Sequence, residues 1–306
     1  MLVDLLAASV RIGTPLLFAA LGGILSERAG VFAVGLEGMM LAGAFSGVIA
    51  TQMFGHLGAG LLASALGGVV LGAIVVVATQ RYGADQMVTG LAVNILALGL
   101  TSFLLRGFGA RGEAPVIRVP TLAPLPIPFL ADLSVIGAVL FRQPPLTYVG
   151  IVLALAVAIV LARTRAGLTL RAVGENPHAV FAVGIDPVRV RALAILVGGA
   201  IAGLGGAVLS LQQVGTFTDG MTNGRGYIAL AAIIVGRWRP MAALAACVVF
   251  GAADALQLRV QGFRLPVSSY VIQMTPYVVA LAVLSGLGRS ARLPAAIGVP
   301  FLRERR

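Results

Sequence analysis

Long apolar runs separated by short arginine-bearing segments constrain this chain more than any other feature. A helix needs about 20 apolar residues to cross the roughly 30 Å hydrocarbon core of a bilayer. Eight runs approach this length: 5–25, 35–54, 59–79, 86–106, 147–163, 191–212, 241–258 and 267–287. A shorter run, 224–237, lies between glycines and Pro240. The sequence therefore predicts an all-α, polytopic membrane helical bundle of about nine transmembrane helices, within a range of eight to ten.

The composition supports the same fold class. Only 11% of the residues are charged and 59% are hydrophobic, whereas a soluble domain carries roughly 25% charged residues. The chain has too few polar side chains to cover a globule, so membrane lipid must be its solvent. Every basic residue is an arginine, and the arginines lie between the apolar runs rather than on one polar face. The net charge of +11 therefore indicates membrane orientation and no nucleic-acid partner.

The arginines also predict which side of the membrane each loop occupies, because cytoplasmic loops are enriched in them. The segment 163–191 is rich in arginine and is placed inside. The turn at Arg237 and Arg239 and the C-terminus are then also cytoplasmic, and the N-terminus is outside. The whole chain, 1–306, is predicted to be a single transmembrane domain.

The longest connection, 107–146, is rich in proline and is predicted to be an outer loop. Within it, the apolar stretch 129–141 is too short to span the bilayer. A half-buried or interfacial helix on the outer face is the structure that this stretch predicts.

Several kinds of chemistry are absent from the sequence. The chain contains no lysine, so it has no phosphate-binding loop of the usual type for ATP. It also lacks the HExxH and GxSxG motifs, and Cys247, His56 and His178 are isolated. We therefore expect no enzyme activity, no metal site and no cofactor.

Polar residues inside apolar segments are costly in a bilayer and are often functional. Such residues are candidates for a solute pathway, and each has the alternative role of bridging neighbouring helices. They are Glu37 near the inner end of the second run, Asn94 in mid-span, Asp254 near the outer end of 241–258, and a group near the short segment 224–237 that comprises Gln212, Thr216, Asp219 and Asn223. A short, glycine-bounded segment such as 224–237 is itself typical of transporter binding sites, because its free backbone groups face a cavity.

Glycines spaced four residues apart recur within the apolar runs, as in the pairs Gly43/Gly47, Gly68/Gly72 and Gly199/Gly203. Such pairs let helix backbones approach closely. Static tight packing is the favoured interpretation, and a moving seam between helices is the alternative.

The segment 167–187, GLTLRAVGENPHAVFAVGIDP, is longer than a plain turn and has apolar residues at helical spacing. Asn176 and Pro177 predict a helix start, as N-cap and first helical residue. Gly184 predicts its end in a left-handed conformation. The result is a helix of about seven residues on the cytoplasmic face. Residues expected to contact a partner there are Arg171, Gly174, Glu175, Asn176, Pro177, Val180, Val183 and Gly184.

Five stretches carry a resemblance to a known family: 14–45 (TPLLFAALGGILSERAGVFAVGLEGMMLAGAF), 167–185, 224–240 (GRGYIALAAIIVGRWRP), 250–258 and 273–284. The chain resembles the inner-membrane permeases of ABC importers for ribose-like sugars and branched-chain amino acids. It is most similar to the branch that handles nucleosides or related simple sugars. The loop 107–146 does not contribute to this resemblance.

The resemblance implies a permease subunit in the bacterial inner membrane that works with several partners. These are an ABC ATPase subunit inside, an extracytoplasmic substrate-binding protein or lipoprotein outside, and a second permease, either identical or paralogous. The helix within 171–184 would contact the ATPase, with a shared role open to the turn at Arg237 and Arg239. ATP would be bound by the ATPase subunit, which agrees with the missing lysine.

Three other functional classes are weighed against this one. A stand-alone secondary transporter would need inverted repeats and an ion site, and no convincing repeat is present. An assembly subunit would have no pathway, and a membrane enzyme would need a nucleophile with a base beside it. The apolar spans with scattered Asn, Gln and Asp suit a neutral polar solute, while a branched-chain amino acid remains an alternative.

Overall fold

The computed structural model describes residues 2–108, 115–128, 131, 136–262, 274–287 and 292–301. Throughout this part of the chain the regular structure is helical, with one isolated bridge between Arg118 and Thr216. The helices are α1 (Leu2–Arg28), α2 (Leu36–Phe54), α3 (Leu57–Val76), α4 (Gln86–Gly107), α5 (Ile136–Leu140), α6 (Pro145–Arg163), α7 (Arg165–Glu175), α8 (Pro177–Ala182), α9 (Pro187–Ala207), α10 (Arg225–Val235), α11 (Pro240–Gly262) and α13 (Thr275–Leu287). Two π-helical turns, η1 (Val77–Arg81) and η3 (Val208–Val214), extend α3 and α9.

Local sequence explains where many of these helices begin. Proline is the first residue of α6, α8, α9 and α11, a position where its missing N–H removes no intrahelical hydrogen bond. Side chains accept a hydrogen bond from the first turn at the starts of five helices, through His56, Asp85, Thr164, Asn176 and Asp186. These caps satisfy backbone donors that would otherwise have no partner.

Six helices of the described part are long and apolar enough to cross a membrane. They are Val3–Arg28, Leu57–Arg81, Gln86–Gly107, Pro145–Arg163, Pro187–Val214 and Pro240–Gln261. The predicted all-helical membrane bundle is confirmed, and the predicted count of about nine spans is corrected to six for this part of the chain.

The three missing spans have separate reasons. The run 35–54 forms α2, but Glu37 and several small or polar residues lower its hydropathy, and most of the helix is buried against protein. The run 224–237 forms α10, whose 11 residues reach only about 16 Å at 1.5 Å per residue. Of the run 267–287, residues 267–273 lie outside the described part, and α13 supplies 13 residues.

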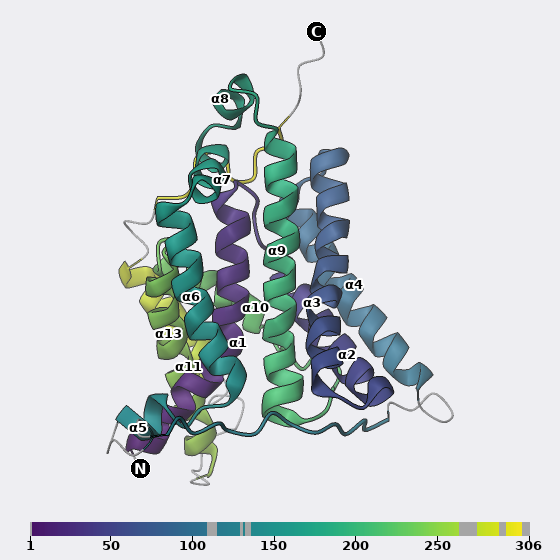
Figure 1. Cartoon of the computed structure of the whole chain (residues 1–306), viewed down its shortest axis with the longest axis vertical. Coiled ribbons are helices and arrows are strands. Elements are labelled where there is room, and N and C mark those ends of the chain that lie inside the picture. The colour runs from purple at the N-terminus through teal and green to yellow at the C-terminus, as the bar shows by residue number, and fades with distance from the viewer. Residues whose placement is uncertain are drawn as a thin grey trace.

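The two ends of the bundle carry different elements (Figure 1). The N-terminal end of α1, the short helix α5 and the segment 115–128 lie at one end, and α7 and α8 lie at the other. Of the interfacial helix predicted over 129–141, the structure describes α5, which packs against α1; residues 129–130 and 132–135 are outside the described part. The predicted helix near 171–184 is α8, preceded by the separate helix α7.

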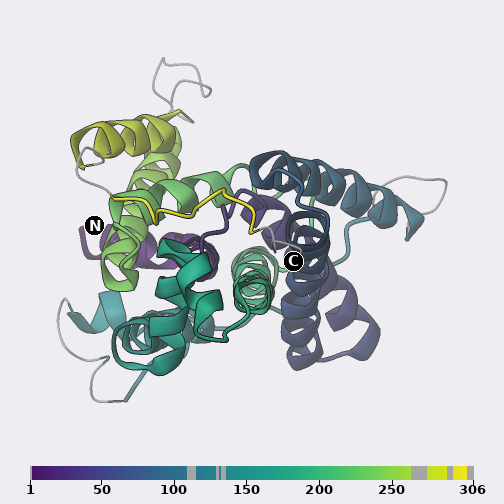
Figure 2. The same cartoon turned by 90° about the horizontal axis from the view of Figure 1, so that it is seen from above.

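Helix α9 lies at the centre of the bundle and contacts α1, α2 and α3 (Figure 2). Glycines make these contacts close. A Cβ atom at Gly22 would overlap the carbonyl of Gly198, one at Gly43 would overlap that of Gly203, and one at Gly68 would overlap that of Gly199. The predicted tight packing of the glycine pairs is therefore confirmed for Gly43, Gly68, Gly199 and Gly203.

We predict that Gly203→Leu prevents correct assembly of the bundle. The new side chain would meet the backbone of α3 at Ser64, and overpacking of this kind costs about 1–3 kcal/mol or more. The measurement is the thermal midpoint and the yield of monodisperse protein after detergent extraction. Gly99→Leu is the matched control, because no atom lies within 4 Å of a Cβ built at Gly99. Equal loss in both variants would contradict the prediction.

Candidate functional site

The carboxylate of Glu37 joins the N-termini of α2 and the short helix α10. Glu37 lies in the first turn of α2, and its Oε1 and Oε2 accept hydrogen bonds from Gly224 N at 2.8 Å and Gly226 N at 2.6 Å. These amides belong to the start of α10, which has no cap from its own N-cap residue, Gly224. Because helix N-termini carry partial positive charge, a carboxylate is favoured at this junction.

Asn94 forms hydrogen bonds with the residues next to the same junction. Its Oδ1 accepts from Gly38 N at 2.8 Å, and its Nδ2 donates to Val34 O and to the Tyr227 hydroxyl, both at 2.9 Å. The side chain is 8% exposed. Asn94 on α4 therefore fixes the start of α2 and the first turn of α10 relative to each other.

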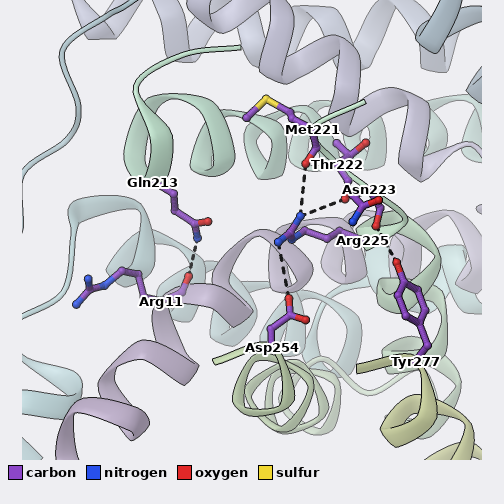
Figure 3. A network of polar contacts seen from close by, with 8 residues as sticks. All are labelled: Arg11, Gln213, Met221, Thr222, Asn223, Arg225, Asp254 and Tyr277. Atoms are coloured by element: carbon purple, nitrogen blue, oxygen red, sulfur yellow. Dashed lines mark hydrogen bonds and ion pairs between the residues drawn. The ribbon is translucent and has the colours of Figure 1, made fainter. Parts of the chain in front are cut away.

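A cavity of about 470 Å³ lies beside the start of α10. Its lining combines polar and apolar residues from α1, η3, α10, α11 and α13: Ile12, Gln213, Asn223, Arg225, Ile228, Asp254, Gln257, Leu258, Met274 and Tyr277. This volume is within the range of ligand pockets, roughly 300–1,000 Å³. Figure 3 shows the side chains of Arg225, Asp254 and Tyr277 around the 221–225 segment.

Arg225 is the charged centre of the cavity wall. Its Nη2 lies 3.8 Å from Asp254 Oδ2, and its Nη1 donates to Met221 O and Thr222 O at 3.4 Å (Figure 3). The buried Nε of Arg225 has no hydrogen-bond partner within the described part of the chain. Buried donors of this kind normally have a partner, so this one is an exception in the cavity wall.

Two tyrosines lie among the polar residues around the start of α10. The Tyr277 hydroxyl donates to Asn223 O at 2.9 Å (Figure 3), and the Tyr227 hydroxyl accepts from Asn94. Asn223 has a left-handed backbone, with φ of 44°, which turns the chain into α10. The residues predicted from sequence that meet around this turn are Glu37, Asn94, Asn223 and Asp254.

The other predicted pathway residues lie elsewhere. Gln212 is buried, accepts from Leu146 N at 3.0 Å and lies 3.4 Å from the Thr147 hydroxyl, so it bridges η3 and α6. Thr216 pairs with Arg118 in the isolated bridge, and Asp219 is exposed. Of the predicted pathway residues, Asn223 and Asp254 line the cavity. Glu37 and Asn94 lie at the adjoining junction, and Gln212, Thr216 and Asp219 lie at neither place.

Sequence reasoning missed Arg225, Tyr227, Gln257 and Tyr277. Arg225 could have been identified from the sequence, because it is a charged residue at the start of an apolar run and directly follows Gly224, the N-cap of the short helix. The two tyrosines and Gln257 had no such signal, because amphipathic side chains are common within apolar segments. Gln257 and Tyr277 reach the cavity through the packing of α11 and α13, and Tyr227 on α10 contacts Asn94.

A second candidate region is formed by α7 and α8 at the opposite end from the N-terminus (Figure 1). The Asn176 side chain accepts from Ala179 N at 3.0 Å, Pro177 is the first residue of α8, and Gly184 has φ of 86°. The predicted helix start and left-handed end are therefore confirmed. Val183 is 74% exposed, as a partner contact requires, but Val180 is 6% exposed and stabilises α8 from within.

The remaining predicted contact residues differ in accessibility. Gly174 is buried, and a Cβ there would overlap Arg28 O. Arg171 Nε donates to Gly167 O at 3.4 Å, and the exposed Glu175 accepts from Ala295 N at 3.4 Å. Arg237 and Arg239 are exposed and flank the buried Trp238.

The segment 292–301 fastens this region to the bundle. Ala296 N donates to Gly174 O at 2.8 Å, and the Phe301 ring lies 5.0 Å from that of His178 and 5.5 Å from that of Phe181. These contacts join α7 and α8 to the C-terminal part of the chain. The segment is therefore a strap over the α7–α8 unit.

Arg191 anchors the strap. The side chain is fully buried at the start of α9 and donates to three backbone carbonyls: Ala29 O at 3.1 Å, Val299 O at 2.9 Å and Ala296 O at 3.3 Å. One guanidinium thus ties the strap to the turn after α1. The residues that follow this turn, up to Val34, lead directly to the start of α2 and to Glu37.

The short helix α10, whose N-terminus meets that of α2 beside a cavity inside a bundle of membrane-spanning helices, is typical of solute transport proteins. Comparison with known proteins agrees with this class. The family model for the branched-chain amino acid transport system / permease component matches residues 5–287, and the chain belongs to this family.

Named relatives extend the comparison. The chain is 36% identical to the guanosine ABC transporter permease protein NupQ of Bacillus subtilis (strain 168), over 98% of this chain and 96% of that protein. It is also 36% identical to the nucleoside ABC transporter permease protein NupC of Lactococcus lactis subsp. cremoris, over 95% and 94% of the two chains. The glucose ABC transporter permease protein TsgB13 of Haloferax volcanii is 28% identical, over 73% and 61%.

We predict that Arg191→Met releases the strap. Three hydrogen bonds from a charged donor would be lost, and each such bond contributes about 1.5–3 kcal/mol. Trypsin cleavage after Arg292, followed by intact mass, should accelerate at least about tenfold, since local opening controls proteolysis.

Arg189→Met is the matched control for the strap experiment. Arg189 lies two residues away, is 85% exposed and pairs with Asp186. Equal cleavage rates for the Arg191→Met variant and the unmodified protein would show that other contacts hold the strap.

Proposed function

We propose that this chain is the permease subunit of an ATP-driven ABC importer that moves a nucleoside, or secondarily a simple sugar, across the bacterial inner membrane. The observation that carries the proposal is the Glu37 junction beside the 470 Å³ cavity, in a chain that is 36% identical to two permeases named for guanosine and nucleoside transport. The chain supplies the pathway, and ATP hydrolysis belongs to a separate subunit.

The chemistry of the cavity supports a neutral polar solute. Asn223, Gln257 and Tyr277 offer uncharged hydrogen-bonding groups, and the charges of Arg225 and Asp254 are already paired with each other. A nucleobase or a ribose presents several donors and acceptors and an apolar face, which fits a wall that also contains Met274 and Leu258. The proposed pathway residues are therefore Glu37, Asn94, Asn223 and Asp254, joined by Arg225 and Tyr277.

The family membership supports the proposed partners. An ABC ATPase subunit would dock on the α7–α8 unit, where Val183 and the charges of Arg171 and Glu175 are placed, with Arg237 and Arg239 nearby on the same side of the bundle. A substrate-binding protein or lipoprotein would deliver the solute to the opposite end. A second permease, identical or paralogous, would complete the translocation unit.

The proposed orientation puts the α7–α8 unit in the cytoplasm and the N-terminus outside. It is supported by the arginine-rich segment 163–191 and by the position of the N-terminal end of α1 at the opposite end of the bundle (Figure 1).

We predict that Glu37→Gln reduces uptake strongly. The glutamine amide has one oxygen to accept from the two backbone donors at the start of α10, where the carboxylate had two. It also lacks the negative charge that interacts favourably with the two helix N-termini. Together these changes should destabilise the junction by about 1.5–3 kcal/mol. Initial uptake of radiolabelled guanosine, glucose and leucine in intact cells measures the effect and compares the solute classes. Guanosine should be the solute transported by the unmodified protein.

Asp219→Asn is the control for Glu37→Gln, because it makes the same change of charge at an exposed position outside the cavity. Uptake that falls equally in both variants would remove the junction from the pathway. Uptake that resists vanadate and follows a proton gradient would instead support a secondary transporter.

We predict that Val183→Asp uncouples transport from ATP hydrolysis or releases the ATPase, while the permease still inserts normally. Burial of one Val-sized side chain against a partner contributes about 1.5–3 kcal/mol, and an aspartate would forfeit it. Co-purification of the ATPase and vanadate-sensitive uptake are the measurements. Leu168→Asp, at a site on α7 that is 61% exposed, is the control for a charge on the same unit.

The same position reports orientation. In a Cys247→Ser background, Val183→Cys should resist an impermeant thiol reagent in intact cells and react after the cells are opened. Labelling in intact cells would reverse the proposed orientation. Full ATPase retention by Val183→Asp would move the docking site to the turn at Arg237 and Arg239.

A further inference from the structure

A second polar cavity, of about 390 Å³, lies at the α7–α8 end of the bundle and away from the pathway. It is enclosed by the end of α1, the last turns of α6, α7, and the turn that joins α10 to α11. The lining residues are Arg28, Ala158, Leu161, Ala162, Arg171, Trp238, Arg239, Pro240 and Met241. None of the residues described above for the solute pathway lines it, whereas Arg171 and Arg239 are also proposed above to lie on the ATPase-docking side.

The charges in this cavity have one sign. Three of its lining residues are arginines, Arg28, Arg171 and Arg239, and none is an acid. Of the nearby acids, Glu27 is buried and its carboxylate accepts from Trp238 Nε1 and Ala33 N. Glu175 accepts from Ala295 N and also attracts Arg28, so three arginines outnumber one nearby acid that acts on them. The cavity therefore favours an anion.

Arg28 is held in place by the local backbone. Arg28 Nε and Nη2 each donate to Trp238 O at 3.2 Å, which ties α1 to the α10–α11 turn. This turn is formed by Arg237 and Trp238, both with left-handed φ, at 51° and 55°. Arg239 then follows directly and is brought over the cavity. A donor fixed as Arg28 is loses less entropy on binding than a mobile surface side chain does.

The other side of the cavity is apolar and opens toward the membrane region. Ala158, Leu161 and Ala162 belong to the candidate span Pro145–Arg163, and Met241 is the second residue of the candidate span Pro240–Gln261. Met241 is 48% exposed. The lining therefore changes from arginine to apolar side chains near the ends of the two spanning helices. A ligand with a charged head group and an apolar chain would match both parts of this lining.

We propose that this cavity binds the phosphate head group of an anionic phospholipid, with its acyl chains along the groove between α6 and α11. Clusters of arginine beside the ends of membrane helices recognise such head groups through charge-assisted hydrogen bonds. An acidic side chain of a docking protein would match the arginines but not the apolar wall formed by two spanning helices. The proposal needs only the membrane-spanning fold and does not depend on the transported solute.

The test measures lipid binding to the purified full-length chain by native mass spectrometry. The probes are phosphatidylglycerol and phosphatidylcholine, titrated separately, and inorganic phosphate as a competitor. The unmodified protein should bind phosphatidylglycerol in preference to phosphatidylcholine. The double variant Arg171→Gln/Arg239→Gln should bind phosphatidylglycerol roughly 30-fold more weakly, because each arginine near an anionic head group contributes about a fivefold factor.

A matched control has the same loss of charge at the same end of the bundle. Arg165→Gln/Arg189→Gln alters two exposed arginines that do not line the cavity and should change the affinity less than about threefold. A third variant, Ala162→Phe, fills the cavity without changing any charge and should also weaken phosphatidylglycerol binding. It keeps the test decisive if the double arginine variant does not fold.

Three outcomes would overturn the proposal. Equal weakening in the two double variants would show a general surface charge effect. Displacement of phosphatidylglycerol by millimolar inorganic phosphate would assign the cavity to a soluble anion. Unchanged lipid binding by Arg171→Gln/Arg239→Gln, together with loss of the co-purified ATPase, would assign the arginines to a protein partner.

Discussion

The close approach of α9 to α1, α2 and α3 is the contact on which the rest of the molecule depends. In a bilayer, helix association gains little from the hydrophobic effect and relies on tight packing. The glycines of α9 face glycines of the three neighbouring helices, so backbone lies against backbone. This central cluster covers α2 on several sides, and α2 can therefore begin inside the bundle and remain a stable element.

Helices α2 and α10 both begin inside the bundle. The backbone N–H groups of their first turns have no partner in lipid, so protein side chains must accept their hydrogen bonds. Glu37 and Asn94 do this at the starts of the two helices. The same requirement explains why polar side chains collect beside the cavity. Near the α7–α8 end of the bundle, Arg191 performs the corresponding task for the carbonyls of Ala29, Ala296 and Val299. The residues between Ala29 and Val34 connect these two polar centres.

Much of the local structure was predictable from short-range rules. The cap at Asn176, the proline at 177 and the left-handed Gly184 follow from backbone sterics within a few residues. Glu37, Asn94, Asn223 and Asp254 stood out because a polar group in an apolar run has a high energetic cost. Gln212 stood out for the same reason, although its hydrogen bonds bridge η3 and α6. The energetic cost of burying a polar group does not by itself distinguish a residue that lines a cavity from one that joins two helices.

The sequence by itself determined the membrane environment, the helical fold class, the absence of an ATP-binding loop and the positions where helices begin. These properties depend on composition and on contacts between residues close in the chain. Only the tertiary structure decided that 224–237 is a half-length helix, that Val180 is buried while Val183 is exposed, and that Arg225, Tyr227 and Tyr277 surround the start of α10. Those outcomes depend on which helix faces pack together, and residues far apart in the sequence carry no local signal of their shared neighbours.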